Sequence, residues 1–465
     1  YLVEAAGKKF LVDCGMWQGK AELEEENFQE FEFNPKEIDF MLLTHAHIDH
    51  SGRIPKLYNE GFKNKIYAHK ATCDLCALML PDSGHIQEME TEWKNRKRIR
   101  KGEKTRDPLY TAEEAAKCLK IFEPVQYDQI IDITDQIHVR FNDAGHMLGS
   151  SIIELWVDED GKTTKTVFTG DIGNNDIPLL SSPTMIEDTD YLIMESTYGN
   201  VDSTDSKFDE CLEENISWAI NKGFTVVCPT FALGRHQEGL YKIKNIKDKS
   251  KIPEDIPVIV DGKSSQIFNA RFKYSDLDIK PEMKNFMPKN TYAIPRSANR
   301  NIVRKEIIKN TEPKIILSPG GMGDYGAAKV YLENLIQRRD VMVHGLGYAS
   351  PISVLYKLLN TQLYDKVNCY GNVYTLNCIA KSTSELTSHA PRDILLRFMK
   401  TFPNIKSVSI NHGELGIQKS CRKYVLNNTE LGEENVDICS PEVGVIIKPE
   451  GIVGTFKTQL ISNDL

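Results

Sequence analysis

The segment LLTHAHIDHSGRIP, residues 42–55, constrains this chain more than any other feature. A strand-like apolar run is followed at once by His45, His47, Asp49 and His50, four metal-binding groups within six positions. His45 and His47 stand two residues apart, so an extended strand end would present them on one side. Imidazole nitrogen and carboxylate oxygen are both ligands that zinc accepts. The segment therefore predicts a metal site at a strand end, with one ion on the first two histidines and a neighbouring ion on Asp49 and His50.

Three further candidate ligands follow apolar runs or glycines elsewhere in the chain. His146 lies in NDAGHMLGSS, Asp171 in VFTGDIGNND and His412 in SINHGEL. Together they would supply what a two-metal centre still lacks, namely a third imidazole for each ion and a carboxylate between the ions. Two metals held about 3.5–4 Å apart can activate a shared water and stabilise both sides of a phosphoryl displacement.

The pattern of apolar runs predicts a layered α/β protein. A chain of 465 residues is long for a single core and natural for two domains. Strand-like runs that end in Asp, His or Gly fill the first 200 residues, and helices are expected over 70–80, 84–98 and 111–122. Beyond about residue 200, apolar runs alternate with helical stretches, which indicates a parallel sheet.

Several features of the second half and of one helix could contact an anion. The glycine-rich turn SPGGMG contains Gly320 and Gly321, and such turns can present backbone N–H groups to a phosphate. Arg235 stands at a predicted helix start, which suits the same contact. The segment KNRKRIRKGEKTR, residues 94–106, has eight basic residues, Arg98 and Arg100 among them, and one acidic residue. It is either a solvated helix face or an arm that contacts phosphates.

Composition excludes some classes of protein. The formal net charge is −9, which by itself argues weakly against a nucleic-acid binder. No uninterrupted apolar stretch approaches about 18 residues, so no membrane-spanning helix is expected. Ten cysteines are scattered along the chain, which favours free thiols in a reducing cytoplasm. The chain opens on Tyr1 as if inside a strand, so a preceding segment is expected to be missing.

The metal-binding segments, taken in order, resemble the four leading motifs of the metallo-β-lactamase fold. These are LVDCG with Asp13, THAHIDH with the four groups at 45–50, AGHMLGSS with His146 and FTGD with Asp171. Later segments resemble motifs of the β-CASP family, the nucleic-acid-processing branch of that superfamily. These are LIMESTYGN with Glu195, CPTFALGRHQEGLY with Arg235, LSPGGMG with Gly320 and Gly321, LTSHAPR with His389, and NHGEL with His412. The similarity runs from about residue 10 to residue 420.

This resemblance implies a fold and a domain order. The fold would be an αββα metallo-β-lactamase sandwich with an inserted β-CASP domain, a parallel sheet flanked by helices. Residues 1–200 and 385–465 would form the sandwich, and residues 201–384 the insertion.

The resemblance also implies roles for individual residues and two zinc ions. His45, His47 and His146 would hold one ion, and Asp49, His50 and His412 the other. Asp171 would bridge the ions, Asp13 would orient a ligand, and Glu195 and His389 would form a pair at the scissile phosphate.

The implied activity is hydrolysis of RNA phosphodiester bonds, endonucleolytic or 5′-to-3′ exonucleolytic. Histidine at position 412 favours RNA, because DNA-repair members of the family have an aliphatic residue there. The alternatives are a small-molecule hydrolase such as a thioesterase or lactonase, a DNA nuclease, and a non-catalytic scaffold. Dimerisation is common among such relatives, so a homodimer is one state that the resemblance implies.

Two departures from the family pattern concern the His389 motif and the substrate groove. The family usually follows its motif B histidine with a small residue and an aspartate, whereas His389 is followed by Ala390, Pro391, Arg392 and Asp393. The segments VDGKSS and GLGYASPISV also differ from their usual counterparts, so the substrate preference is expected to differ from that of better-known members.

Overall fold

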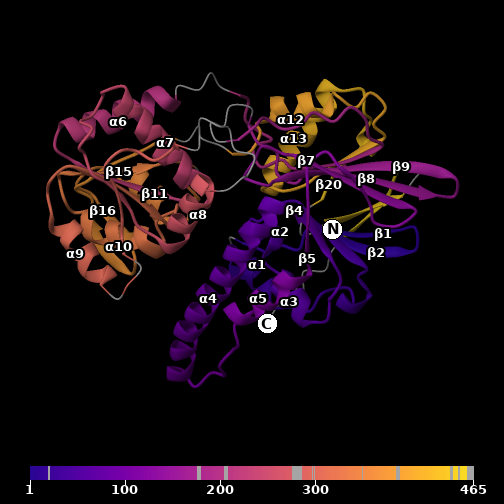
Figure 1. The fold of residues 1–465 in the computed structure, drawn as a ribbon, viewed down its shortest axis with the longest axis horizontal. Helices are drawn as coiled ribbons and strands as arrows, with labels where there is room; N and C mark the ends of the chain where they lie inside the picture. The colour runs from indigo at the N-terminus through magenta and orange to yellow at the C-terminus, as the bar shows by residue number, and fades with distance from the viewer. Residues whose placement is uncertain are drawn as a thin grey trace. The chain divides into compact units, whose positions relative to one another are not determined.

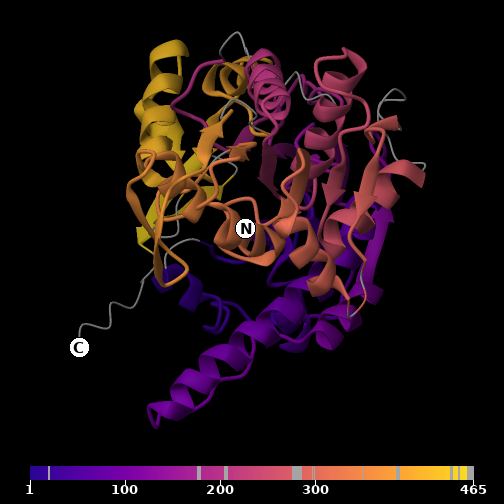
Figure 2. The ribbon, with the colours of Figure 1, turned by 90° about the vertical axis from the view of Figure 1, so that its left-hand side faces the viewer.

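The chain folds into two compact units (Figures 1 and 2). Unit 1 comprises Tyr1–Ser203 and Ser388–Leu465, and unit 2 comprises Thr204–Thr387. The computed structural model describes residues 1–18, 21–174, 180–203, 208–274, 285–295, 297, 299–347, 349–383, 388–439, 443–448 and 451–457. The predicted domain limit at 384/385 lies outside the described residues.

Unit 1 is built on two β-sheets. The five-stranded sheet contains, in spatial order, β1 Leu2–Ala5, β2 Lys8–Val12, β3 Phe40–Leu43, β4 Ile66–His69 and β5 Phe122–Val125. The seven-stranded sheet contains, in spatial order, β20 Val436–Ile438, β19 Ser407–Ile410, β10 Tyr191–Met194, β9 Lys162–Phe168, β8 Ser151–Glu159, β7 Ile137–Asp143 and β6 Ile130–Asp132. Buried side chains of both sheets form one core, in which Phe10 and Phe40 lie among Phe141, Ile153 and Phe168. The two sheets therefore pack face to face.

Helices cover the outer faces of this sandwich. On the first sheet's side lie α2 Ile48–Ser51, α3 Ile54–Asn59, α4 Lys70–Arg100 and α5 Ala112–Cys118, with α4 in contact with β4 and β5. On the second sheet, α12 Arg392–Met399 and α13 Leu415–Asn428 bury Leu395, Phe398 and Val425 against Leu192 and Val408. The remaining helices and strands of this unit are α1 Ala21–Glu26, the 3-10 turns Pro35–Glu37, Leu119–Ile121 and Glu433–Asn435, and the hairpin β21 Val443–Lys448 with β22 Gly451–Lys457. The predicted αββα sandwich is confirmed.

The prediction of two helices over 70–80 and 84–98 is wrong, because α4 is a single 31-residue helix with Pro81 inside it. Proline removes one backbone donor and disfavours a helix interior. The buried face formed by Leu75, Cys76, Leu80 and Gly84 holds the helix together across that position. The next predicted helix, 111–122, is shorter than expected. Thr111 is its N-cap, and α5 gives way to a 3-10 turn after Cys118.

Unit 2 contains the predicted parallel sheet. Its spatial order is β13 Thr291–Ala293, β12 Val258–Val260, β14 Lys314–Pro319, β11 Thr225–Thr230, β15 Val341–Gly345 and β18 Ile379–Ser382, and each neighbouring pair is parallel. The flanking helices are α6 Phe208–Asn221, α7 Arg235–Asp248, α8 Lys263–Tyr274, α9 Arg300–Lys309, α10 Gly326–Leu335 and α11 Val354–Leu359, and β16 Lys366–Cys369 pairs with β17 Asn372–Thr375. Among the helices that the structure describes, none combines the length and the apolar composition needed to cross a membrane.

Candidate metal centre

The candidate site of unit 1 is assembled at the carboxyl ends of its strands. In the first sheet β2 and β3 run parallel, so Asp13 and the 45–50 segment leave the same edge. In the second sheet β9, β10 and β19 are parallel neighbours, and Asp171, Glu195 and His412 follow their ends. His146 comes from the connection between β7 and β8. Strand topology thus gathers residues from distant parts of the sequence.

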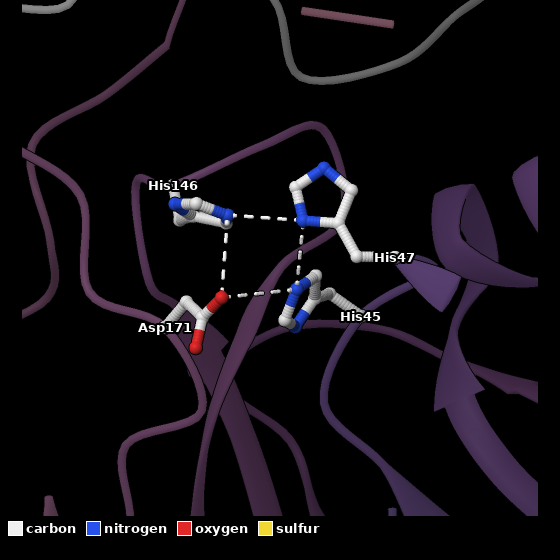
Figure 3. A group of neighbouring side chains, drawn as sticks. All are labelled: His45, His47, His146 and Asp171. Atoms are coloured by element: carbon white, nitrogen blue, oxygen red, sulfur yellow. Dashed lines mark hydrogen bonds and ion pairs between the residues drawn. The ribbon is translucent and has the colours of Figure 1, made fainter. Parts of the chain in front are cut away.

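The first group of candidate ligands contains His45, His47, His146 and Asp171 (Figure 3). His47 Nδ1 lies 3.1 Å from His45 Nε2 and 3.2 Å from His146 Nε2. Asp171 Oδ2 lies 3.4 Å from His45 Nε2 and 3.5 Å from His146 Nε2. Three ring nitrogens and one oxygen therefore face a common centre. Lone pairs of three imidazoles cannot all be satisfied by one another, whereas a cation in their midst would satisfy them together.

The second group contains Asp49, His50 and His412. His412 Nε2 lies 3.2 Å from Asp49 Oδ2, and His50 Nε2 lies 4.0 Å from the same oxygen. Asp171 Oδ1 faces this group, at 3.3 Å from His50 Nε2 and 3.7 Å from His412 Nε2. The two oxygens of one carboxylate thus face two separate sets of imidazoles.

Buried polar atoms without partners support the fit to a cation. Asp171 is 1% exposed and His50 is 8% exposed. Asp171 Oδ1 and His50 Nε2 make no hydrogen bond, although they lie 3.3 Å apart. Leaving such atoms unpaired is costly, and a bound ion would satisfy both. The donor set, mixed nitrogen and oxygen, suits a divalent metal of zinc's type.

The outward ring nitrogens are hydrogen-bonded, which fixes how the rings point. His50 Nδ1 lies 2.7 Å from Asp13 Oδ2, and His146 Nδ1 lies 3.0 Å from the Ser388 carbonyl oxygen. His412 Nδ1 lies 2.8 Å from Thr197 Oγ1. A ring that donates from Nδ1 keeps the lone pair of Nε2 for a metal, so these contacts orient the rings toward the two groups.

Asp13 is held next to His50 by several hydrogen bonds. Its carboxylate accepts hydrogen bonds from the backbone N–H and the hydroxyl of Thr44, both at 2.8 Å, in addition to the contact with His50. Burial alone would raise the pKa of Asp13, but His50 and these hydrogen bonds lower it, so the group stays ionised. Asp13 therefore contacts a candidate ligand and is not itself one of the candidate metal ligands found among the described residues.

Glu195 and His389 form a separate pair at the edge of the first group. His389 Nδ1 lies 2.9 Å from Glu195 Oε2 and 3.9 Å from Asp171 Oδ2. Glu195 is fully buried and also accepts a hydrogen bond from the backbone N–H of Ile172 at 2.6 Å. The carboxylate therefore holds both the position and the tautomer of the His389 ring.

The protonation of the first group suits metal binding. Burial lowers the pKa of His47 to about 3, with His45 nearby adding to the effect. Burial likewise lowers the pKa of His45 and of His146. All three rings are then neutral at neutral pH, which is the state that binds a metal.

When no cation is bound, protons on His412 and His50 balance the negative charge of the carboxylates that face the second group. Burial opposes the charge on His412, but Asp171 and Asp49 raise its pKa to about 9. The pKa of His50 is raised well above its usual value, against burial, by Asp171 and Asp13. Burial would raise the pKa of Asp171, yet His412 and His50 hold it well below its usual value. A divalent cation would replace the protons as the positive charge facing the carboxylates.

The predicted substrate contacts belong to other helices and turns, and their role stays a prediction. Arg235 begins α7 of unit 2, where its guanidinium pairs with the buried Glu238 at 2.8 Å. Gly320 follows β14 with φ +107°, and a Cβ there would lie 2.3 Å from the Tyr325 carbonyl oxygen. A Cβ on Gly321 would lie 3.0 Å from the Phe231 ring. Backbone packing therefore requires glycine at position 320, whereas position 321 is only closely packed.

Arg98 and Arg100 are in the last turn of α4 in unit 1. Arg98 is half-buried there and Arg100 is exposed, and their contact with a substrate stays a prediction.

Sequence reasoning missed the residues that orient the ligands. Thr44 lies between Asp13 and the histidine segment, Thr197 contacts His412, and the Ser388 carbonyl contacts His146. Thr44 and Thr197 stand directly beside predicted motifs, so their positions in THAHIDH and ESTYGN were the available signal. A backbone carbonyl such as that of Ser388 leaves no signal in the sequence.

The fold and the site define a metal-dependent hydrolase of the metallo-β-lactamase superfamily. A model described as the metallo-beta-lactamase superfamily matches residues 1–196, and a model of the Beta-Casp domain matches residues 236–358.

Curated relatives match both units of the chain. The ribonuclease TTHA0252 of Thermus thermophilus is 28% identical over 429 residues, covering 89% of this chain and 90% of that protein. An RNase J-like protein of Methanocaldococcus jannaschii is 30% identical over 423 residues, covering 89% of this chain and 88% of that protein. The transcription termination factor FttA of Methanothermobacter thermautotrophicus is 27% identical over 431 residues, covering 89% of this chain and 64% of that protein. This chain belongs to the β-CASP family of the metallo-β-lactamase superfamily.

Proposed function

We propose that this protein hydrolyses RNA phosphodiester bonds with the help of two zinc ions. The observation that carries the proposal is the carboxylate of Asp171, whose two oxygens face two separate groups of imidazoles at 3.3–3.7 Å. A carboxylate so placed can bridge two cations. Two-metal sites of this kind serve in-line displacement at phosphorus.

In this proposal each ion has three ligands of its own and shares Asp171. His45, His47 and His146 hold one ion, and Asp49, His50 and His412 hold the other. Asp13 orients His50 through the 2.7 Å contact to its Nδ1. Zinc is favoured because it accepts the mixture of nitrogen and oxygen donors found here.

A bound pair of divalent ions would supply an activated water and stabilise negative charge on the phosphoryl oxygens. The protein's own contribution is the Glu195–His389 pair. Since Nδ1 of His389 is directed to Glu195, the other ring nitrogen is the one that can donate a proton to the leaving oxygen. Glu195 keeps the ring in that orientation.

RNA is favoured as the substrate by two independent supports. Relatives that span most of this chain's length are named a ribonuclease and an RNase J-like protein. Histidine at position 412 is the residue type that the RNA-cleaving branch has at this motif. All the proposed ligands and the Glu195–His389 pair belong to unit 1 of one chain, so the chemistry needs no second copy, and a homodimer would serve another purpose. Ten cysteines with no disulfide among them agree with action in the cytoplasm.

The test is cleavage of matched substrates by the zinc-loaded protein. RNA and DNA of the same sequence, labelled at the 5′ or the 3′ end, are incubated with the loaded protein and with the protein after chelation. We expect cleavage of RNA only, dependent on the metal, and the two labels distinguish internal from end-directed cutting. Intact RNA together with hydrolysis of a thioester or lactone would show that the proposal is wrong, and equal cleavage of DNA would assign a DNA nuclease instead.

A further inference from the structure

The second half of α4 extends beyond the sandwich of unit 1. Every buried residue of this helix lies between Ala71 and Gly84, and none lies in 85–100. Both ribbon views show the end of the helix projecting from the sheets, accompanied only by the segment that returns to α5 (Figures 1 and 2). We call residues 85–107 the α4 arm. Because the end of this helix covers no hydrophobic core, core packing does not explain its length.

The α4 arm is held in place by specific contacts. The Asn95 side chain and the Arg106 backbone exchange two hydrogen bonds, at 2.7 and 2.9 Å, which tie the returning segment to the helix. The guanidinium of Arg106 pairs with Glu25 at 2.6 Å and stacks 3.4 Å from the centre of the Phe28 ring. These contacts give the arm a fixed geometry rather than a frayed end.

One face of the arm presents apolar and aromatic groups to solvent. Ile86, Met89 and Trp93 are 45%, 58% and 57% exposed, and Lys97 and Arg100 continue the same stripe at helical spacing. The Lys97 ammonium lies 3.5 Å from the centre of the Trp93 ring. An exposed indole with a cation over one face can bind a base on its other face and a phosphate at the cation.

Cations at the tip of the arm lack ion-pair partners. Within the part of the chain that the structure describes, Lys97, Arg98, Arg100, Lys101 and Lys104 form no ion pair. Among the other basic residues of the arm, Lys94, Arg96 and Arg106 pair with Glu90, Glu92 and Glu25. The Arg98 guanidinium donates to the Lys104 carbonyl oxygen at 3.4 Å. The charge at the tip thus complements a polyanion and repels a basic partner.

The helix that carries the arm begins next to the loop that contains His146. The hydroxyl of Thr72, in the first turn of α4, donates to the carbonyl oxygen of Gly149, three residues after His146. From Thr72 to Arg100 the helix rises about 42 Å at about 1.5 Å per residue. One rigid element therefore joins the site to a cationic tip about 40 Å away.

We propose that the α4 arm is a docking surface for single-stranded RNA that extends from the site of cleavage. Trp93 stacks on a base, and Lys97, Arg100 and Lys101 contact phosphates. This inference rests on the proposed ribonuclease function. It assigns the arm to RNA rather than to a protein partner because the tip has several unpaired cations around one exposed indole.

The test compares long and short RNA with the zinc-loaded protein. The variant combines Lys97→Ala, Arg100→Ala and Lys101→Ala. A matched control combines Lys36→Ala, Lys162→Ala and Lys423→Ala, three exposed lysines elsewhere in unit 1. Cleavage kinetics are measured on an RNA of about 30 nucleotides, long enough to reach the arm, and on a tetranucleotide that is not. Anisotropy of the labelled long RNA reports binding separately from cleavage.

For the arm variant we expect KM for the long RNA to rise about tenfold, with kcat unchanged. The slope of log affinity against log salt should fall by about 2, since each single-strand phosphate contact contributes about 0.7. The tetranucleotide and the control variant should behave as wild type. Trp93→Ala should also raise KM for the long RNA, whereas Trp93→Phe should keep most of the affinity.

Two outcomes separate this inference from the proposed function. If the wild type cleaved long RNA and the arm variant showed the same KM and the same salt slope, the inference would be wrong. The exposed face of the arm would then be assigned to a protein partner. If the wild type cleaved neither RNA, the proposed function would fail, and the anisotropy salt slope would still decide whether the arm binds RNA.

Discussion

Replacing Asp171 with asparagine tests the bridging carboxylate directly. The substitution keeps the shape of the side chain but leaves one oxygen and places an NH₂ group where the other oxygen stood. In the native protein Oδ2 faces His45 and His146, and Oδ1 faces His50 and His412. Whichever way the amide turns, one of the two groups meets a donor instead of an acceptor. Asp171→Asn should therefore retain one ion and lose the other.

The size of the effect follows from the distances. A unit charge about 3.5 Å from a second unit charge, at an effective dielectric constant of about 20, interacts with about 5 kcal/mol. Losing that interaction in the transition state would slow cleavage by about 10³- to 10⁴-fold. RNA binding should change far less than the rate, because Asp171 is 1% exposed and therefore does not contact the RNA surface directly.

Three measurements check the prediction for Asp171→Asn. Elemental analysis counts zinc per chain after dialysis, end-labelled RNA reports the rate, and anisotropy reports binding. The control is Asp132→Asn, since Asp132 also pairs with a histidine of unit 1, His138 at 2.6 Å, but lies on β6 outside the metal groups. A variant that kept two ions per chain and the wild-type rate would refute the bridging role.

Three other substitutions test the Glu195–His389 pair, the backbone conformation at Gly149 and the buried His236 of unit 2. Glu195→Gln should lower kcat about 100-fold, because His389 loses its orienting carboxylate, while zinc content by elemental analysis stays as in the wild type. Gly149→Ala should lower the free energy of unfolding in urea by more than the about 1–2 kcal/mol expected of Gly161→Ala. Both glycines have positive φ, but only at Gly149 would a Cβ meet another atom, the backbone nitrogen of Thr72 at 2.6 Å. His236→Gln should flatten the pH dependence of unfolding. Burial lowers the pKa of His236 to about 3, so the unfolded chain binds its proton near pH 6.5 and the folded chain does not. Stability then falls by up to about 5 kcal/mol as pH drops from 6.5 toward 3, and urea unfolding at several pH values should show that loss in the wild type only. Equal pH slopes in the two proteins would contradict the assignment.

Strand positions and candidate ligands were predictable because their signals are local. Apolar runs that are followed by polar residues became β2, β3, β9, β10 and β19, and the polar residues after them lie at the site. Polar side chains within a buried strand have few hydrogen-bond partners, so such residues are found at the strand ends. The resemblance to the β-CASP family then supplied the order of the two domains.

Features that depend on packing were not predictable. Pro81 indicates a helix end when only its neighbours in sequence are considered, yet α4 continues through it. Gly84 is required because a Cβ there would lie 2.7 Å from the backbone nitrogen of Ala112, a residue far along the chain. Arg235 carries the charge expected of a phosphate contact, but its pairing with Glu238 shows only once the helix is built. At Pro81 and Gly84 long-range packing overrides a local preference, whereas at Arg235 a contact one helical turn away uses the charge.

Backbone strain indicates that the fold shapes the candidate metal centre before any ion binds. Asp13 has φ +62° and His412 has φ +47°, a region that costs an L residue about 1–2 kcal/mol. Backbone hydrogen bonds hold both residues there, from the Asp13 N–H to the Leu42 carbonyl oxygen at 2.9 Å and from the Ser196 N–H to the His412 carbonyl oxygen at 3.0 Å. Because these contacts come from neighbouring strand ends, the sheet imposes the strain and the ligands need not impose it. A ligand substitution should then weaken metal binding far more than it weakens folding, since the backbone that carries the ligand is secured by the sheet.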